Sequence, residues 1–164
     1  MIKPKQPLTP NQALKRAAAL CARCEQATGD VSAKLLQWGL GSDEARQVLE
    51  QLLKQGFIDD ERYARAFVKD RFALNGWGRV KIAHQLRQKG VPDDVIGQAM
   101  SLIGDEEYRQ RLTLLLQAKW KSLQDRQPRA AWAALMRFAA SRGFEAGLAH
   151  DCAKDLTRFD VDDD

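Results

Sequence analysis

The sequence contains few of the residues that β-sheets require. Valine, isoleucine and threonine together account for 16 of the 164 residues, whereas alanine and leucine account for 43. β-Branched side chains favour strands, while alanine and leucine favour helices. Proline, which breaks helices, does not occur between Asn11 and Val91. These shortages exclude an all-β fold, disfavour a βαβ sheet and predict an all-α protein.

The sequence also lacks the features of membrane, secreted and disulfide-rich proteins. Its uncharged stretches are well short of the roughly 20 apolar residues that span a bilayer, and no apolar segment follows the basic residues near Met1. Three cysteines are an odd number for a disulfide framework. We therefore expect a soluble, cytoplasmic protein with reduced thiols, which is a monomer and makes no contact with a membrane.

No group of residues suggests an active site, a metal site or a cofactor site. Cys21 and Cys24 lie one helical turn apart on an apolar face, so we interpret both as small core residues. No second cysteine pair and no histidine pair is present to complete a zinc site. Gly76 and Gly78 lack the lysine of a phosphate-binding loop, and His84 has no catalytic partner nearby. The prediction is a protein without enzymatic activity, catalytic residues, metal or cofactor.

Positive charge is concentrated in two blocks of the sequence. The chain has 26 basic and 22 acidic residues, for a net charge of +4. Eight basic residues and one acid lie within residues 62–90, and eight basic residues and one acid lie within residues 109–142. Such blocks are compatible both with solvated helix faces and with a surface that binds a polyanion. The charge pattern leaves both interpretations open.

Turn-forming residues divide the chain into nine predicted helices. The first begins at a capping box, in which Thr9 is followed by Pro10 and Gln12. Gly29 is expected to separate the first two helices. The predicted helices span approximately residues 10–24, 31–38, 42–55, 60–74, 79–89, 93–103, 105–123, 129–142 and 146–157.

Apolar residues recur with a period near 50 residues. When the chain is aligned on Gly39, Gly90 and Gly143, apolar residues coincide eight and four positions before each glycine and six, nine and thirteen positions after it. This periodicity predicts three tandem three-helix repeats that form an elongated, curved array. The predicted boundaries are 9–58 for repeat 1, 59–104 for repeat 2 and 105–158 for repeat 3, followed by an acidic mobile tail at 159–164.

Trp77 is the aromatic residue best placed in the sequence for a binding role. It lies between two glycines and close to basic residues, so it is either an anchor for a turn or an aromatic residue at a binding surface. We expect Arg79 and Lys81 to be exposed. The predicted contact surface comprises Arg71, Trp77, Arg79, Lys81, Arg87 and Lys89.

The segment from Gly56 to Val91 reads Gly-Phe-Ile-Asp-Asp-Glu-Arg-Tyr-Ala at 56–64, Gly-Trp-Gly-Arg-Val-Lys-Ile at 76–82 and Lys-Gly-Val at 89–91. With these motifs the chain resembles the RecX family, whose members regulate the RecA recombinase. The resemblance implies a protein without enzymatic activity that binds the filament of RecA on single-stranded DNA, within its helical groove. It also implies that the protein blocks filament extension or promotes disassembly, and so inhibits ATP hydrolysis, strand exchange and the co-protease activity of the SOS response.

Two other classes of function fit the same residues. A general nucleic-acid-binding helical-repeat protein would use the basic blocks on phosphates and contact single- or double-stranded DNA directly, with a steep dependence on salt. A helical adaptor would carry the same charges for solubility alone. A pull-down with nuclease treatment separates the three. A RecA complex that survives the nuclease favours the RecX-like regulator, loss of every partner favours the general nucleic-acid-binding protein, and retention of a different protein favours the adaptor.

Overall fold

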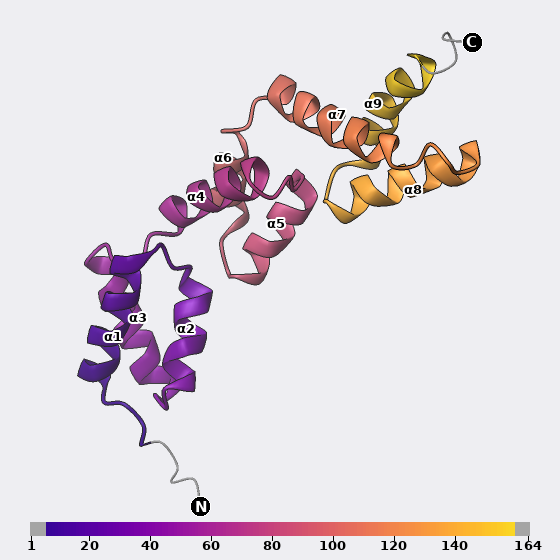
Figure 1. The fold of residues 1–164 in the computed structure, drawn as a ribbon. Coiled ribbons are helices and arrows are strands. Elements are labelled where there is room, and N and C mark those ends of the chain that lie inside the picture. The colour runs from indigo at the N-terminus through magenta and orange to yellow at the C-terminus, as the bar shows by residue number, and fades with distance from the viewer. Residues whose placement is uncertain (1–5, 160–164) are drawn as a thin grey trace, which may run out of the picture. The chain divides into compact units, whose positions relative to one another are not determined.

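Nine α-helices and no strand make up residues 6–159, the part of the chain that this computed structural model describes (Figure 1). The predicted all-α fold class and the predicted number of helices are both confirmed. The helices are α1 (Pro10–Arg23), α2 (Thr28–Gln37), α3 (Ser42–Lys54), α4 (Asp60–Ala73), α5 (Arg79–Gln88), α6 (Asp93–Met100), α7 (Asp105–Lys121), α8 (Pro128–Ser141) and α9 (Ala146–Phe159).

The described residues divide into two compact units. The first contains the residues up to Ala66 together with Leu86–Ala99, and the second contains Phe67–Gln85 together with the residues from Met100 onward. In the first unit α1, α2 and α3 pack on one another, and in the second α7, α8 and α9 do so. The three repeats are predicted from the periodicity of the sequence, and their boundaries stay predictions. Of the predicted acidic tail at 159–164, Phe159 is the last residue of α9, and residues 160–164 lie outside the described residues.

The start of α1 is capped by residues next to it in the sequence, whereas the start of α2 is capped by a residue distant in the sequence. At α1 the predicted capping box is present, since the Thr9 hydroxyl accepts from the Gln12 N–H and the Gln12 side chain accepts from the Thr9 N–H. The predicted break at Gly29 is wrong, because α2 begins at Thr28 and includes that glycine. The Asp60 carboxylate accepts hydrogen bonds from the Thr28 N–H at 3.0 Å and from its hydroxyl at 2.8 Å. A residue distant in sequence thus caps a helix start that the local sequence leaves uncapped.

The same helix-ending turn occurs at each of the three glycines on which the repeats align, and also at Gly56, where φ is 76° and the Phe57 N–H donates to the Leu52 carbonyl at 3.0 Å. Gly39, Gly90 and Gly143 have φ angles of 95°, 81° and 86°, in the left-handed region that glycine adopts without steric cost. In each turn the residue after the glycine donates a hydrogen bond to the carbonyl five positions earlier, at 3.2, 3.1 and 3.0 Å, as in the Schellman motif. The glycines on which the repeats align are therefore structurally equivalent.

The recurring apolar positions form the cores of the two units. Val31, Ile82 and Leu135, eight residues before each turn glycine, are at most 1% exposed. Cys152 is buried, as its position in the repeat predicts. Cys21 packs half-buried against the first core, but Cys24 is exposed. The prediction that Cys24 is a core residue is wrong because α1 ends at Arg23, which places the second thiol beyond the helical face.

A second kind of glycine joins a helix-ending turn to the start of a helix that is distant in sequence. The Gly29 N–H donates to the Lys89 carbonyl at 3.1 Å, and the Gly78 N–H donates to the Arg142 carbonyl at 2.7 Å. Each acceptor is the residue directly before a turn glycine. A Cβ at Gly29 or Gly78 would lie closer than 3.0 Å to the carbonyl oxygen of Lys89 or Gly143. The first of these junctions lies within the first compact unit, and the second lies within the second unit.

Candidate functional site

Trp77 lies in the turn between α4 and α5, in the second compact unit. Its backbone N–H donates to the Arg71 carbonyl at 3.0 Å. Its half-buried ring packs edge-on against the Phe67 ring, with the two centroids 6.3 Å apart. Gly78 fixes the other side of the turn through its contact with the turn between α8 and α9. Trp77 therefore anchors the turn and keeps part of its ring exposed.

Two cations lie over the Trp77 ring. The guanidinium carbon of Arg71 is 5.3 Å from the ring centroid, and the Nζ of Lys81 is 4.4 Å from it. Arg71 also donates to the side-chain oxygen of Asn75 at 3.1 Å, and Lys81 reaches the Ser141 carbonyl at 3.4 Å. These contacts bring together residues of α4, the turn and α5, which are three of the six residues of the predicted contact surface.

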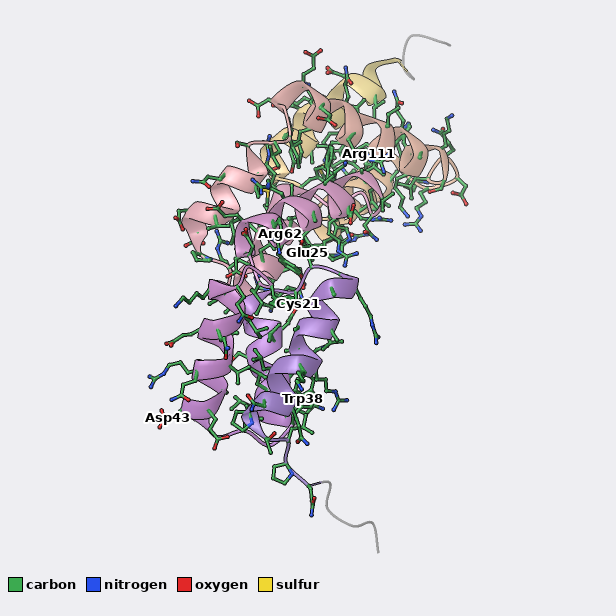
Figure 2. All side chains as sticks on the ribbon, turned by 90° about the vertical axis from the view of Figure 1, so that its left-hand side faces the viewer. Cys21, Glu25, Trp38, Asp43, Arg62 and Arg111 are labelled. Atoms are coloured by element: carbon green, nitrogen blue, oxygen red, sulfur yellow. The ribbon has the colours of Figure 1, made fainter. Side chains whose placement is uncertain are left out.

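Two arginines that the prediction did not include lie at the C-terminal end of α4. Arg111 of α7, labelled in Figure 2, donates to the Ala73 carbonyl at 3.1 Å, and Arg142 donates to the Asn75 carbonyl at 2.9 Å. The last carbonyls of a helix carry partial negative charge and favour cations. Both arginines belong to the second basic block, but the sequence gives no indication of partners so distant. We define the Trp77 cluster as Arg71, Trp77, Lys81, Arg111 and Arg142.

The Trp77 cluster carries four positive charges that no described carboxylate neutralises. The ion pairs found among residues 6–159 involve other cations. The Nε atoms of Arg71 and Arg111 are buried and have no hydrogen-bond partner. The cluster thus carries uncompensated positive charge, which an anionic ligand complements.

Arg79 supports the fold rather than the Trp77 cluster. Its guanidinium is 2.9 Å from the Asp105 carboxylate and 4.1 Å from the centroid of the Tyr108 ring. Its backbone N–H donates to the Tyr108 hydroxyl at 3.0 Å, and that hydroxyl donates to Glu145 at 2.6 Å. Burial, reinforced by the hydrogen bond to Glu145, strongly raises the pKa of Tyr108. The hydroxyl therefore stays protonated and links α5, α7 and the start of α9.

The prediction that Arg79 and Lys81 are both exposed is wrong. Each is half-buried, because each side chain lies across a neighbouring aromatic ring. The charge of Arg79 is also neutralised by Asp105, whereas the hydrogen bond of Lys81 is to the neutral Ser141 carbonyl. Of the two, Lys81 is the cation that remains available to an anionic ligand.

Arg87 and Lys89 are neutralised in the first compact unit. The Nε of Arg87 is 2.8 Å from the Asp93 carboxylate, and the Nζ of Lys89 is 2.8 Å from the Asp30 carboxylate. The hydrogen bond to Asp30 is the main cause of the raised pKa of Lys89, so the ammonium stays charged within its pair. Neither residue is a member of the Trp77 cluster, and their part in a contact surface stays a prediction.

Arg62 is neutralised in the same unit by Glu25. The Arg62 Nε is 2.7 Å from the Glu25 carboxylate, and Figure 2 shows these two side chains meeting where α4 begins. Arg62 also donates to the Gly56 carbonyl at 3.1 Å. Three basic residues of the first block, Arg62, Arg87 and Lys89, are therefore paired with carboxylates in the first unit. The two that belong to the Trp77 cluster, Arg71 and Lys81, are not paired.

The described residues offer no alternative site with metal or membrane chemistry. Within residues 6–159, no group of three or more histidine, cysteine or acidic side chains is placed to hold a metal ion. No helix in that range has the length and apolar character needed to cross a membrane. The three cysteines are free thiols, and His84 lies exposed on α5.

Comparison with known proteins gives consistent matches. Residues 59–100 match the family model described as RecX, second three-helix domain. The chain is 27% identical over 162 residues to Regulatory protein RecX of Amycolatopsis mediterranei (strain U-32), covering 94% of this chain and 91% of that protein. It is 30% identical over 145 residues to Regulatory protein RecX of Mycobacterium sp. (strain JLS), covering 84% of this chain and 79% of that protein. Its fold is similar to the crystal structure of RecX from Lactobacillus salivarius, with a TM-score of 0.79, 17% identity and coverage of 90% and 96% of the two chains.

Proposed function

Because this chain belongs to the RecX family of regulatory proteins, we propose that it regulates the RecA recombinase by binding the filament of RecA on single-stranded DNA, within the helical groove. The family consists of regulatory proteins, which agrees with the prediction that the chain is not an enzyme. From the groove, the protein blocks filament extension or promotes disassembly. It thereby lowers ATP hydrolysis, strand exchange and cleavage of the SOS repressor by RecA in the cytoplasm.

The Trp77 cluster is the observation that supports this proposal most directly. Three of its residues, Arg71, Trp77 and Lys81, lie within the segment that matches the RecX family model. A filament of RecA on DNA presents phosphates, which four unneutralised cations complement. A part-exposed tryptophan flanked by arginine has the composition of a binding hot spot. The contact surface proposed for the filament is therefore centred on Trp77.

The hydrolysis of ATP by RecA on single-stranded DNA, measured while this protein is titrated in, tests the proposal. We expect substoichiometric protein to slow hydrolysis and to shorten the filaments seen by electron microscopy, because one bound molecule stops the addition of many RecA subunits. Unchanged hydrolysis at an equimolar ratio in low salt would refute the proposed function.

A double variant, Arg71→Gln with Lys81→Gln, tests the proposed contact surface. Losing two of the four unneutralised charges should raise the protein concentration needed for half-maximal inhibition at least severalfold. Lys69→Gln is the matched control, since Lys69 is an exposed cation of α4 outside the Trp77 cluster. Undiminished inhibition by a double variant with native helix content would place the contact elsewhere, on the second basic block at residues 109–142.

A general nucleic-acid-binding helical-repeat protein is the second candidate, and the same unneutralised cations favour it. The two candidates differ in what a tagged protein retains from a cell lysate after nuclease treatment. Retention of RecA supports the proposed function. Loss of every partner on nuclease treatment supports the general nucleic-acid-binding protein.

A further inference from the structure

A pocket of about 630 Å³ lies in the first compact unit, where the segment before α1 passes the end of α2. It is lined by residues 6–8, by Arg16 of α1 and by residues 37–39. Trp38, which Figure 2 labels, is the aromatic residue of this lining. A pocket of this volume is large enough to hold a ligand or a side chain of a partner.

Hydrogen bonds and close packing hold the walls of this pocket in place. The Leu8 N–H donates to the Trp38 carbonyl at 3.0 Å, and the capping box at Thr9 joins the segment to the start of α1. Leu8 and Trp38 both pack against the core of the first unit. A Cβ added at Gly39 would lie closer than 3.0 Å to Pro7. The pocket is therefore formed before a ligand binds, and binding requires little ordering of the chain.

Arg16 brings an unneutralised positive charge to the pocket. Its guanidinium carbon is 4.7 Å from the centroid of the Trp38 ring. None of the ion pairs found among residues 6–159 involves Arg16, and none of the described residues that line the pocket is acidic. Residues 1–5 contain two lysines and no acid. The ring restrains the guanidinium without cancelling its charge, so its N–H groups are available to a carboxylate.

We propose that these residues, which we call the Arg16 pocket, bind an acidic segment of a partner protein. A glutamate or aspartate carboxylate of the segment accepts hydrogen bonds from the Arg16 guanidinium. An apolar side chain next to that carboxylate packs against Leu8 and the Trp38 ring. Arginine and tryptophan are enriched among the residues that contribute most to binding at protein interfaces. The partner is thus recognised by one carboxylate beside one apolar side chain.

The lining favours a protein segment over a small molecule or a nucleic acid. Apart from Leu8 and Trp38, which are half-buried, the lining residues are exposed. Such open walls do not enclose most of a small ligand, as small-molecule sites do, whereas a side chain carried on a larger surface needs no enclosure. A nucleic-acid backbone is held by a series of cations, but Arg16 is the one charged residue of the described lining.

Nuclear magnetic resonance of the full chain, titrated with the acetylated and amidated peptide Gly-Ser-Leu-Glu-Leu-Ser-Gly, tests the inference. We expect the indole N–H resonance of Trp38 to shift and to saturate as the peptide reaches millimolar concentration. The other three tryptophans are internal controls. Trp77 also has cations over its ring, so an equal shift at Trp77 would indicate attraction of the peptide to any such pair. Either that result or an unshifted Trp38 resonance would overturn the inference.

Arg16→Gln should weaken binding of the peptide about tenfold, because the hydrogen bonds between the guanidinium and the carboxylate are lost. Lys15→Gln is the matched control, since Lys15 is the neighbouring exposed cation of α1 and does not line the pocket. We expect this control to bind the peptide as the unchanged protein does. Both side chains are exposed, so neither substitution disturbs the core. Equal weakening by the two substitutions would reduce the effect to net charge and refute a specific pocket.

Two altered probes separate recognition of the segment from simple charge attraction. The peptide with glutamine in place of glutamate should bind about tenfold more weakly, and the peptide with serine in place of both leucines should bind severalfold more weakly. Oligothymidylate should not displace the original peptide from Trp38. Equal binding of either altered peptide, or displacement by oligothymidylate, would overturn the inference.

The Arg16 pocket and the Trp77 cluster belong to different compact units, so the two proposals fail separately. A protein that inhibits RecA and does not bind the peptide refutes only the acidic-segment site. One that binds the peptide and leaves RecA hydrolysis unchanged refutes only the proposed function.

Discussion

Replacing Gly78 by alanine tests the junction between the start of α5 and the turn between α8 and α9. The added Cβ would lie closer than 3.0 Å to three backbone atoms, which are the carbonyl carbon and oxygen of Gly143 and the nitrogen of Phe144. None of them is the end of a flexible side chain that can rotate away. The clash can therefore be relieved only if the two backbone segments move apart.

Separating these segments breaks two backbone hydrogen bonds. The Gly78 N–H donates to the Arg142 carbonyl at 2.7 Å, and the Val80 N–H donates to the Gly143 carbonyl at 3.0 Å. A net hydrogen bond contributes about 1 kcal/mol to stability, and a buried group left without its partner costs about 1–3 kcal/mol. We therefore expect Gly78→Ala to lower the free energy of unfolding by about 3 kcal/mol, a large part of the 5–15 kcal/mol typical of a folded domain.

Urea unfolding, followed by circular dichroism at the helix band, measures this loss. Gly147→Ala is the matched control, because Gly147 lies in the first turn of α9 in the same unit and its added Cβ would have no atom of another element within 4 Å. This control should leave stability unchanged or raise it by up to about 1 kcal/mol, since alanine favours helix over glycine. A Gly78→Ala protein within about 0.5 kcal/mol of the unchanged chain would refute the argument for a close junction.

Four further outcomes are expected. Arg79→Gln removes the ion pair with Asp105 and the cation over the Tyr108 ring. It should lower the free energy of unfolding in urea by about 1–2 kcal/mol. If Arg79 acts only in ligand binding, the free energy of unfolding would not change. The folded pKa of Tyr108 is raised above its ordinary value of 10.0, so its contribution to stability is complete below that pH and is lost as pH rises toward the folded pKa. Thermal melts of Tyr108→Phe should therefore show a lower melting temperature at neutral pH and a shallower decline at alkaline pH. Thr9→Ala removes the cap of α1 and should cost about 1 kcal/mol in urea unfolding, an effect that an unchanged midpoint would exclude. Deleting residues 160–164, which contain four aspartates, should tighten binding to single-stranded DNA at low salt and have no effect once salt screens the charges, whereas equal affinities at low salt would leave the tail without a role in DNA binding.

The fold could be predicted where its determinants are local in sequence. The start of α1 follows from the capping box at Thr9, and the three equivalent turns follow from the need for a positive φ at Gly39, Gly90 and Gly143. The start of α2 could not be predicted in the same way. Its cap is a carboxylate 32 residues along the chain, and its first turn contains a glycine that the junction requires. A glycine needed for close packing and a glycine that ends a helix are not distinguishable by residue type alone.

The candidate site was predicted only in part, because charge counted along the sequence does not reveal which charges are neutralised. Arg71, Trp77 and Lys81 are near enough in sequence for a short turn to bring them together. Arg111 and Arg142 join them through hydrogen bonds to carbonyls 38 and 67 residues away. Periodicity predicts which face of a helix is buried, but it does not predict which end of one helix meets the side chains of another.

The position of a cation relative to helix ends distinguishes the Trp77 cluster from three of the neutralised basic residues. Acidic residues favour the first turn of a helix, and the carboxylates that neutralise Lys89, Arg87 and Arg79 belong to the first turns of α2, α6 and α7. The Trp77 cluster instead faces the last residues of α4 and α8, where its cations meet neutral carbonyls. A carbonyl satisfies the hydrogen bond of a cation without cancelling its charge. In this chain, basic residues that face helix C-termini therefore keep their charge, whereas Arg79, Arg87 and Lys89, which face helix N-termini, are paired.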